Sequence, residues 1–178
     1  MFEDYLKDSN EFYLIATDAK SKNEIDSARR YYRVSIMCAF NAIESFVNYI
    51  AKSFEEADNL EKLEICFLND KELYFSPTKG ICTRTKFTPI DEKLKVLIKR
   101  FNSTYDFEKS AEWGNLKSFK DFRDSLVHSR KSEDETSLDE YERRVKIGNK
   151  SVIEIMNLIS QGMYHQPLRK NLLDLIPE

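Results

Sequence analysis

The sequence predicts an all-α protein, a single bundle of five or six helices. Three observations favour this fold class. The chain has 178 residues but only 4 Gly and 4 Pro, which leaves little turn chemistry for a many-stranded β fold. Hydrophobic residues make up 41% and charged residues 33%, the balance of a soluble globular protein. Apolar residues also recur every three and four positions over long segments, as in amphipathic helices. We therefore expect one helical domain over residues 1–178.

Two helices are expected at the start of the chain. The first covers about residues 2–19, and the second runs from an N-cap at Asn23, with Asp26 in its first turn, to about Glu56. The apolar positions of the second helix form the stripe of a core-facing helix: Ile36, Phe40, Ile43, Val47 and Ile50.

A short third helix and a long connection should follow. Asp58 and Glu61 form a capping box for the helix. Residues 74–89 contain two prolines and a glycine, which predicts one long loop that has room for a short strand pair around Tyr74 and Lys86.

The next two helices are indicated by a cap and by an apolar face. Thr88 is the expected N-cap before Pro89 at the first helical position. Another helix should cover about residues 111–131, with one apolar face made of Leu116, Phe119, Phe122 and Leu126.

A last long helix and a tail complete the expected bundle. Ser137 and Glu140 form a capping box for a helix that ends near Gly162. The tail, about 164–178, should be a loop that holds on to the core through an apolar group of Leu172, Leu173, Leu175 and Ile176.

The composition also limits the compartment and the chemistry. The formal net charge is −3, which argues against a general nucleic-acid coat. Three cysteines without a C-x-x-C pair suit a reducing compartment better than a disulfide framework. The N-terminus lacks a signal-peptide pattern, and we expect no apolar stretch near the roughly 20 residues that span a bilayer. We therefore expect a cytoplasmic protein without a membrane segment, metal or cofactor.

Charge is unevenly distributed along the chain. Residues 79–131 contain 13 Lys and Arg against 7 Asp and Glu, so this segment carries +6 and the remainder −9. Such a basic middle suits an anionic ligand bound at one place. Aromatic residues in this segment offer surfaces for base stacking, although such residues more often belong to the core.

One segment of the expected helix over 111–131 carries residues suited to catalysis. Taking Phe119 as 0° on a wheel of about 100° per residue, Arg123 lies near 40°, inside the apolar face, where it needs a partner. Asp124 and His128 are neighbours at i and i+4, so the carboxylate is placed to orient the imidazole. The other histidine, His165, lies beyond the last helix without such neighbours.

Arg123 and His128 are too far apart on the wheel to meet on one straight helix. Two copies of the helix that meet at a two-fold axis would bring both groups into one cleft. The arginine would hold a phosphodiester and the charge that develops on it, while the histidine would move a proton to or from a ribose 2′-hydroxyl or the leaving 5′-oxygen.

The long second helix offers supporting residues beside its apolar stripe. Asn41, Glu44 and Asn48 form a polar strip, and Arg33 continues the line of the stripe toward the N-terminal end of the helix. Glu44 is a candidate partner for Arg123. An ordinary buried ion pair with helix-packing amides explains the same spacing, and spacing alone favours that explanation.

These residues together resemble a known family. Arg123-Asp124-x-x-x-His128 is similar to the R-x4–6-H motif of the HEPN superfamily, and the segment Ala42–Ile50 is similar to an early helix of those bundles. The resemblance implies a helical bundle that dimerises and cuts RNA without a metal, often as a toxin or defence ribonuclease. Arg123 and His128 would then be catalytic and Asp124 would support them. A separate protein would act as any antitoxin.

Three interpretations of the sequence remain open. The chain is a metal-independent endoribonuclease that acts as a homodimer, or a catalytically silent module that binds a protein or nucleic acid through the same surface. In the third interpretation, Arg123, Glu44 and His128 are purely structural. The intact motif favours the first.

Overall fold

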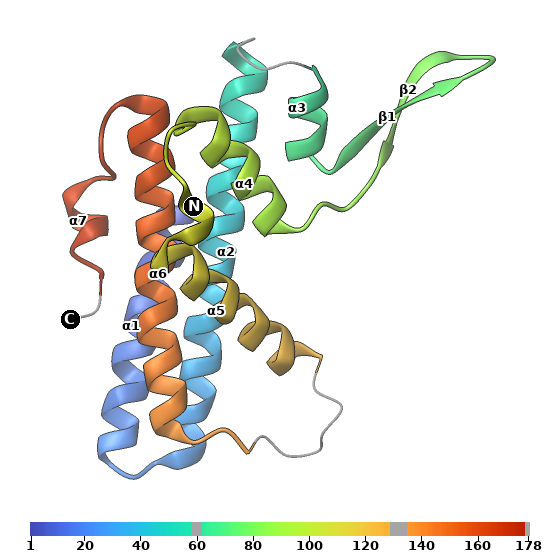
Figure 1. Ribbon diagram of the computed structural model, residues 1–178. Coiled ribbons are helices and arrows are strands. Elements are labelled where there is room, and N and C mark those ends of the chain that lie inside the picture. Colours follow the sequence, from blue (N-terminus) through green and yellow to red (C-terminus); the bar gives the residue numbers. More distant parts are fainter. Residues whose placement is uncertain (58–61, 129–134, 177–178) are drawn as a thin grey trace.

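The computed structural model describes residues 1–57, 62–128 and 135–176, which form a mostly helical bundle (Figure 1). Its elements in chain order are α1 (Phe2–Ser21), α2 (Ile25–Ala57), α3 (Lys62–Leu68), β1 (Lys71–Ser76), β2 (Gly80–Thr85), α4 (Ile90–Phe101), the 3₁₀ helix η1 (Phe107–Lys109), α5 (Ala111–Val127), α6 (Leu138–Tyr164) and α7 (Lys170–Leu173). The prediction of an all-α bundle is confirmed. Within the described residues there are seven α-helices rather than five or six, because the tail adds the short α7.

The core is built around α2, which contacts α1 and every α-helix from α3 to α6. All residues of its expected apolar stripe are at most 3% exposed. Figure 1 shows α1 and α6 lying alongside α2, with α5 crossing the same bundle at an angle. The predicted apolar face of α5 is buried as well, except that Leu126 is half-buried. These faces hold the C-terminal half of α5 against α2 and α6.

A small polar network joins the three longest helices inside the core. The Ser9 Oγ donates to the carbonyl of Ser35 at 3.0 Å, and the Ser35 Oγ donates to the carbonyl of Ser9 at 2.7 Å. The Asn149 Nδ2 donates to the Ser35 Oγ at 3.3 Å. These bonds satisfy buried hydroxyl and amide N–H groups that would otherwise cost about 1–3 kcal/mol each, whereas the buried Asn149 Oδ1 has no hydrogen-bond partner among the described residues.

The helix starts agree with the sequence at one expected cap and differ at two others. The Ser137 Oγ accepts the backbone N–H of Glu140, as predicted for the start of α6. Asn23 is not an N-cap: with φ of 60° it forms the left-handed turn before α2, a conformation that asparagine tolerates. Pro89 itself, not Thr88, is the N-cap residue of α4. The capping box of Asp58 and Glu61 lies outside the described residues.

A β-hairpin over residues 71–85 replaces most of the loop that was expected over 74–89. β1 and β2 pair antiparallel, with Tyr74 opposite Cys82 and Phe75 opposite Ile81. A strand pair was allowed for around Tyr74 and Lys86, but Lys86 follows the end of β2. Gly80 has φ of 74° and begins β2 directly after the turn, a backbone conformation that favours glycine. Prolines and a glycine therefore mark the turn and the exit of the hairpin here.

The C-terminal tail attaches to the bundle through apolar side chains, as predicted. Leu172 in α7 is 1% exposed, and Leu173, Leu175 and Ile176 pack partly buried against the same core. Much of the tail thus continues the bundle.

The expectation that no apolar stretch is long enough to span a bilayer was wrong for α2. Among the described residues, Ile25–Glu56 is long and apolar enough, by length and composition alone, to cross a bilayer. More than half of its most apolar window is buried inside the protein. The core helix of a soluble protein has the same character, so packing accounts for α2, and the structure is compatible with a soluble protein.

Candidate functional site

The end of α5 presents the motif residues at the surface of the bundle. The helix begins at the Ser110 cap, whose hydroxyl accepts the backbone N–H of Trp113. From there the buried Phe119 and Phe122 hold its inner face against α2 and α6. Arg123 follows Phe122 at the border between the buried face and solvent.

Arg123 lies on an aromatic ring of α2. Its guanidinium carbon is 4.5 Å from the centroid of the Phe40 ring, and the side chain is 23% exposed. The Nε is 3.0 Å from the Asp124 Oδ1, an ion-pair distance. This Nε is nevertheless buried and makes no hydrogen bond with any described residue. The guanidinium is therefore held by the Phe40 ring and the Asp124 carboxylate, while part of the side chain is open to solvent.

Asp124 faces cations rather than the imidazole that was expected to contact it. Besides Arg123, its carboxylate has Lys120 at 3.4 Å. The Lys120 Nζ is also 3.7 Å from the Asp91 Oδ1 at the start of α4. These half-buried charges form a continuous row from α4 to the end of α5, in which the acidic and basic groups alternate.

His128 lies at the end of α5 and not inside a longer helix. The helix ends at Val127, and His128 is the C-cap residue, whose backbone N–H donates to the carbonyl of Asp124 at 2.9 Å. Residues 129–131, which were expected to continue the helix, lie outside the described part of the chain. The His128 side chain is exposed, and no contact between it and the Asp124 carboxylate occurs among the described residues. The imidazole is thus accessible from solvent.

The polar strip of α2 is not gathered around Arg123. Asn41, Glu44 and Asn48 are all exposed, and the described residues include no ion pair between Glu44 and Arg123. Asn48 lines a groove of about 680 Å³ between α1, α2, α6 and α7, which neither Arg123 nor His128 lines. Of these three residues, Asn48 therefore borders a groove away from the motif, and the expected pair of Glu44 with Arg123 is not formed among the described residues.

The fourth predicted supporting residue, Arg33, contacts the helix beside α5. Its Nε donates to the Tyr141 hydroxyl at 3.1 Å, and the Tyr141 ring packs edge-on against Phe122 at 5.3 Å. One turn earlier on α2, the Arg29 guanidinium donates to the carbonyl of Thr136 at 3.3 Å. Two arginines of α2 thus lie near the start of α6.

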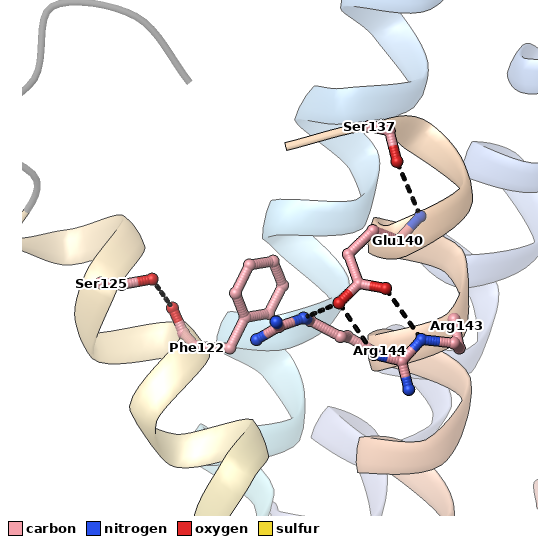
Figure 2. A network of polar contacts seen from close by, with 6 residues as sticks. All are labelled: Phe122, Ser125, Ser137, Glu140, Arg143 and Arg144. Atoms are coloured by element: carbon pink, nitrogen blue, oxygen red, sulfur yellow. Dashed lines mark hydrogen bonds and ion pairs between the residues drawn. The ribbon is translucent and has the colours of Figure 1, made fainter. Parts of the chain in front are cut away.

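The start of α6 adds two arginines that sequence reasoning did not single out. The Glu140 carboxylate accepts from Arg143 in a bidentate contact at 2.8 Å and from Arg144 at 2.5 Å. Figure 2 shows the carboxylate between both guanidinium groups, with that of Arg144 beside the Phe122 ring at 4.6 Å. These two guanidinium groups lower the pKa of Glu140 to about 2. The i+3 and i+4 spacing was the signal that would have found this cluster.

This arrangement is suited to binding an anion. Arg123 of α5 lies over the Phe40 ring, and Arg144 of α6 lies over the Phe122 ring of α5. Arg29 and Arg33 of α2 make their hydrogen bonds near the start of α6. Guanidinium groups bind phosphate oxygens through paired hydrogen bonds. Among the described residues no group of three or more His, Cys, Asp or Glu side chains is arranged to hold a metal ion.

No protein-family model, curated protein or solved structure matches the chain.

Proposed function

We propose that the protein is a metal-independent endoribonuclease of the HEPN type, which acts as a homodimer through Arg123, Asp124 and His128. The observation that carries the proposal is the position of Arg123, whose guanidinium lies over the Phe40 ring beside the Asp124 carboxylate while the side chain stays 23% exposed. A phosphodiester would bind at the exposed part of the guanidinium. The exposed imidazole of His128 ends the same helix.

The reaction needs a proton transfer and an anion-binding group. The ribose 2′-oxygen attacks the adjacent phosphorus, the bond to the 5′-oxygen breaks, and the products are a 2′,3′-cyclic phosphate and a 5′-hydroxyl. His128 removes the proton from the 2′-hydroxyl or supplies one to the 5′-oxygen. Arg123 stabilises the charge that develops on the phosphoryl oxygens.

The homodimer supplies what one chain lacks. Arg123 faces α2, whereas His128 is exposed at the helix end, so we assign the arginine of one site to one protomer and its histidine to the other. The proposed setting is the cytoplasm, where a toxin or defence ribonuclease acts on RNA and a separate antitoxin or other protein partner restrains it.

A second candidate function is favoured by one observation. Arg123 and Lys120 occupy the surroundings of the Asp124 carboxylate, so no described acidic group orients the His128 imidazole. A catalytically silent module that binds a protein or nucleic-acid partner at the same surface would need no oriented imidazole.

Cleavage of labelled RNA in EDTA tests the proposal. The wild type, His128→Asn and Arg123→Lys are compared, and we expect each substitution to reduce cleavage by at least about 100-fold, the usual contribution of a general acid–base group or an oxyanion-stabilising donor. Lysine keeps the charge of Arg123 but lacks its planar fork.

The chain offers matched controls for both substitutions. His165→Asn changes the other histidine, an exposed residue whose φ of 55° asparagine accepts, and Arg30→Lys changes an exposed arginine on α2. Both controls should cleave like the wild type. An inactive wild type would support the binding module, and full activity in His128→Asn would remove that residue from the mechanism.

A further inference from the structure

The β-hairpin stands away from the bundle and exposes large apolar side chains. Figure 1 shows β1 and β2 projecting beyond α3, the helix that β1 contacts. Phe75 is 73% exposed, Ile81 opposite it is 72% exposed, and Phe87 just after β2 is 80% exposed. We call residues 71–87 the arm. A two-stranded hairpin alone is marginally stable in water, and the exposed apolar side chains of this one add no packing to the bundle, which suggests that they contact a ligand.

The arm is firmly attached at its base. The Asp70 carboxylate accepts the backbone N–H of Thr88 and the Nζ of Lys93, both at 2.8 Å, and the backbone N–H of Lys86 donates to the Asp70 carbonyl at 2.8 Å. Lys93 is 5% exposed, so this ion pair is partly shielded from solvent. These contacts fix the direction in which the hairpin projects.

The arm is cationic in a chain of negative net charge. Residues 71–87 contain four basic residues, which are Lys71, Lys79, Arg84 and Lys86, against one acidic residue, Glu72. Glu72 binds both Arg84 and Lys86 at 2.6–2.9 Å, and these two cations lower its pKa. The arm thus carries +3 whereas the whole chain carries −3. Lys71 and Lys79 make no ion pair among the described residues.

The two faces of the hairpin carry different side chains. The register places Phe75 and Ile81 on one face and Tyr74 with Arg84 on the other. The Arg84 guanidinium lies over the Tyr74 ring, 5.6 Å from its centroid. Exposed aromatic rings beside free cations are what single-stranded nucleic acids contact, because bases stack on the rings and the phosphates pair with the cations.

We propose that the hairpin is a binding arm for single-stranded RNA, with bases stacked on Phe75 and Phe87 and phosphates held by Lys71 and Lys79. The choice of RNA over DNA rests on the proposed function, since cleavage without a metal uses the 2′-hydroxyl. The chain runs from the base of the arm into α4, whose Asp91 is 3.7 Å from the Lys120 Nζ in the charge row that ends at Arg123.

Fluorescence anisotropy with a labelled single-stranded RNA of about 12 nucleotides, within the size range of such sites, tests the arm. The full chain carries His128→Asn so that the RNA stays intact. We expect Phe75→Ser with Phe87→Ser to weaken affinity about tenfold or more, from lost stacking. Lys71→Glu with Lys79→Glu should weaken it and reduce the salt dependence by about one unit of slope per lost contact.

Control substitutions on α1 match these changes. Leu14→Ser and Lys7→Glu alter an exposed apolar residue and an exposed cation far along the chain from the hairpin, and both should bind RNA as before. Thermal unfolding should show the same midpoint for all variants, since the changed side chains are exposed.

The outcomes separate the arm from the proposed catalysis. Unchanged RNA affinity in the hairpin variants, or no RNA binding at all, overturns the proposal that the arm binds RNA. The cleavage assay then tests the proposed ribonuclease independently. Hairpin-dependent binding without cleavage by the wild type supports the arm and removes the ribonuclease. Equal affinity for DNA of the same sequence, or an effect of the hairpin variants on self-association alone, also overturns the proposal.

Discussion

At the scale of single residues, Arg123 obtains its position from a ring rather than from a carboxylate. The helical wheel placed Arg123 inside the apolar face, where it would need a partner, and in the structure the side chain is 23% exposed at the edge of that face. The predicted partner was Glu44, whereas the structure supplies Phe40 and the adjacent Asp124. A search for opposite charge leads to an acidic partner for an arginine. Phe40 was not considered, because it belongs to the apolar stripe that was assigned to the core. The pattern on one helix also does not say which residue of the facing helix lies opposite.

Phe40 and Arg123 should be energetically coupled. The Phe40 ring also stacks on Phe119 at 5.2 Å. In a double-mutant cycle of Phe40→Leu and Arg123→Ala, measured by urea unfolding, we expect a coupling of about 0.5–1 kcal/mol from the cation–π contact. RNA cleavage by Phe40→Leu should fall while its fold persists. Strictly additive unfolding free energies would show that the ring does not hold the arginine.

At the scale of elements, α5 is positioned by a close approach to α6. A Cβ added to Gly148 in α6 would overlap the Phe119 ring of α5, whereas one added to Gly114 in α5 meets nothing within 4 Å. The sequence predicted both helices and the buried face of α5. It gave no sign of this contact, because a glycine inside a helical pattern looks the same whether or not a ring rests on it.

Alanine at these two glycines should have opposite effects. Gly148→Ala should lower the free energy of unfolding by about 1–3 kcal/mol through overpacking against Phe119. Gly114→Ala, the matched control, should raise it by up to about 1 kcal/mol through helix propensity. Urea denaturation measures both. Equal stability of the two variants would mean that α5 and α6 are not packed this closely.

The start of α6 should respond to acid through Glu140. Its pKa in the folded state is about 2, below the ordinary value near 4.3, so its ion pairs stabilise the protein above that ordinary value and this contribution is lost as the pH falls toward 2. Glu140→Gln should therefore be less stable than the wild type at pH 6, and the difference should shrink steadily down to pH about 2.

Urea midpoints measured at several pH values follow this difference. Glu11→Gln, an exposed position on α1, serves as the control and should track the wild type throughout. A difference between Glu140→Gln and the wild type that stays constant with pH would contradict the ion pairs to Arg143 and Arg144.

The hairpin shows where local patterns stop predicting an element. Proline and glycine indicated a break in the helices. Strands of six residues are too short for the alternation of apolar and polar side chains to identify them. Its anchor, Asp70 with Lys93 and Thr88, joins residues that are up to 23 positions apart, and such a contact has no signature in the local sequence.

At the scale of the whole molecule, the account depends on two copies of the chain. The bundle places Arg123 on α5 and sets Arg144 over the Phe122 ring of the same helix, and His128 is exposed at the helix end. The sequence predicted the bundle and the apolar attachment of the tail, because apolar periodicity and the Ser137 cap are local, but it did not predict α7 in the tail. The supporting role of Asn41, Glu44 and Asn48 stays a prediction, since these side chains are exposed and no ion pair joins Glu44 to Arg123 among the described residues.

The most direct test of this account is complementation between two inactive variants. Arg123→Lys and His128→Asn are unfolded together, refolded as a mixture and assayed for RNA cleavage in EDTA. In a composite site, half of the dimers formed by random pairing are mixed, and each has one intact site of two, so we expect about a quarter of the wild-type activity. A mixture no more active than either variant alone, beside an active wild type, would contradict a site shared between protomers.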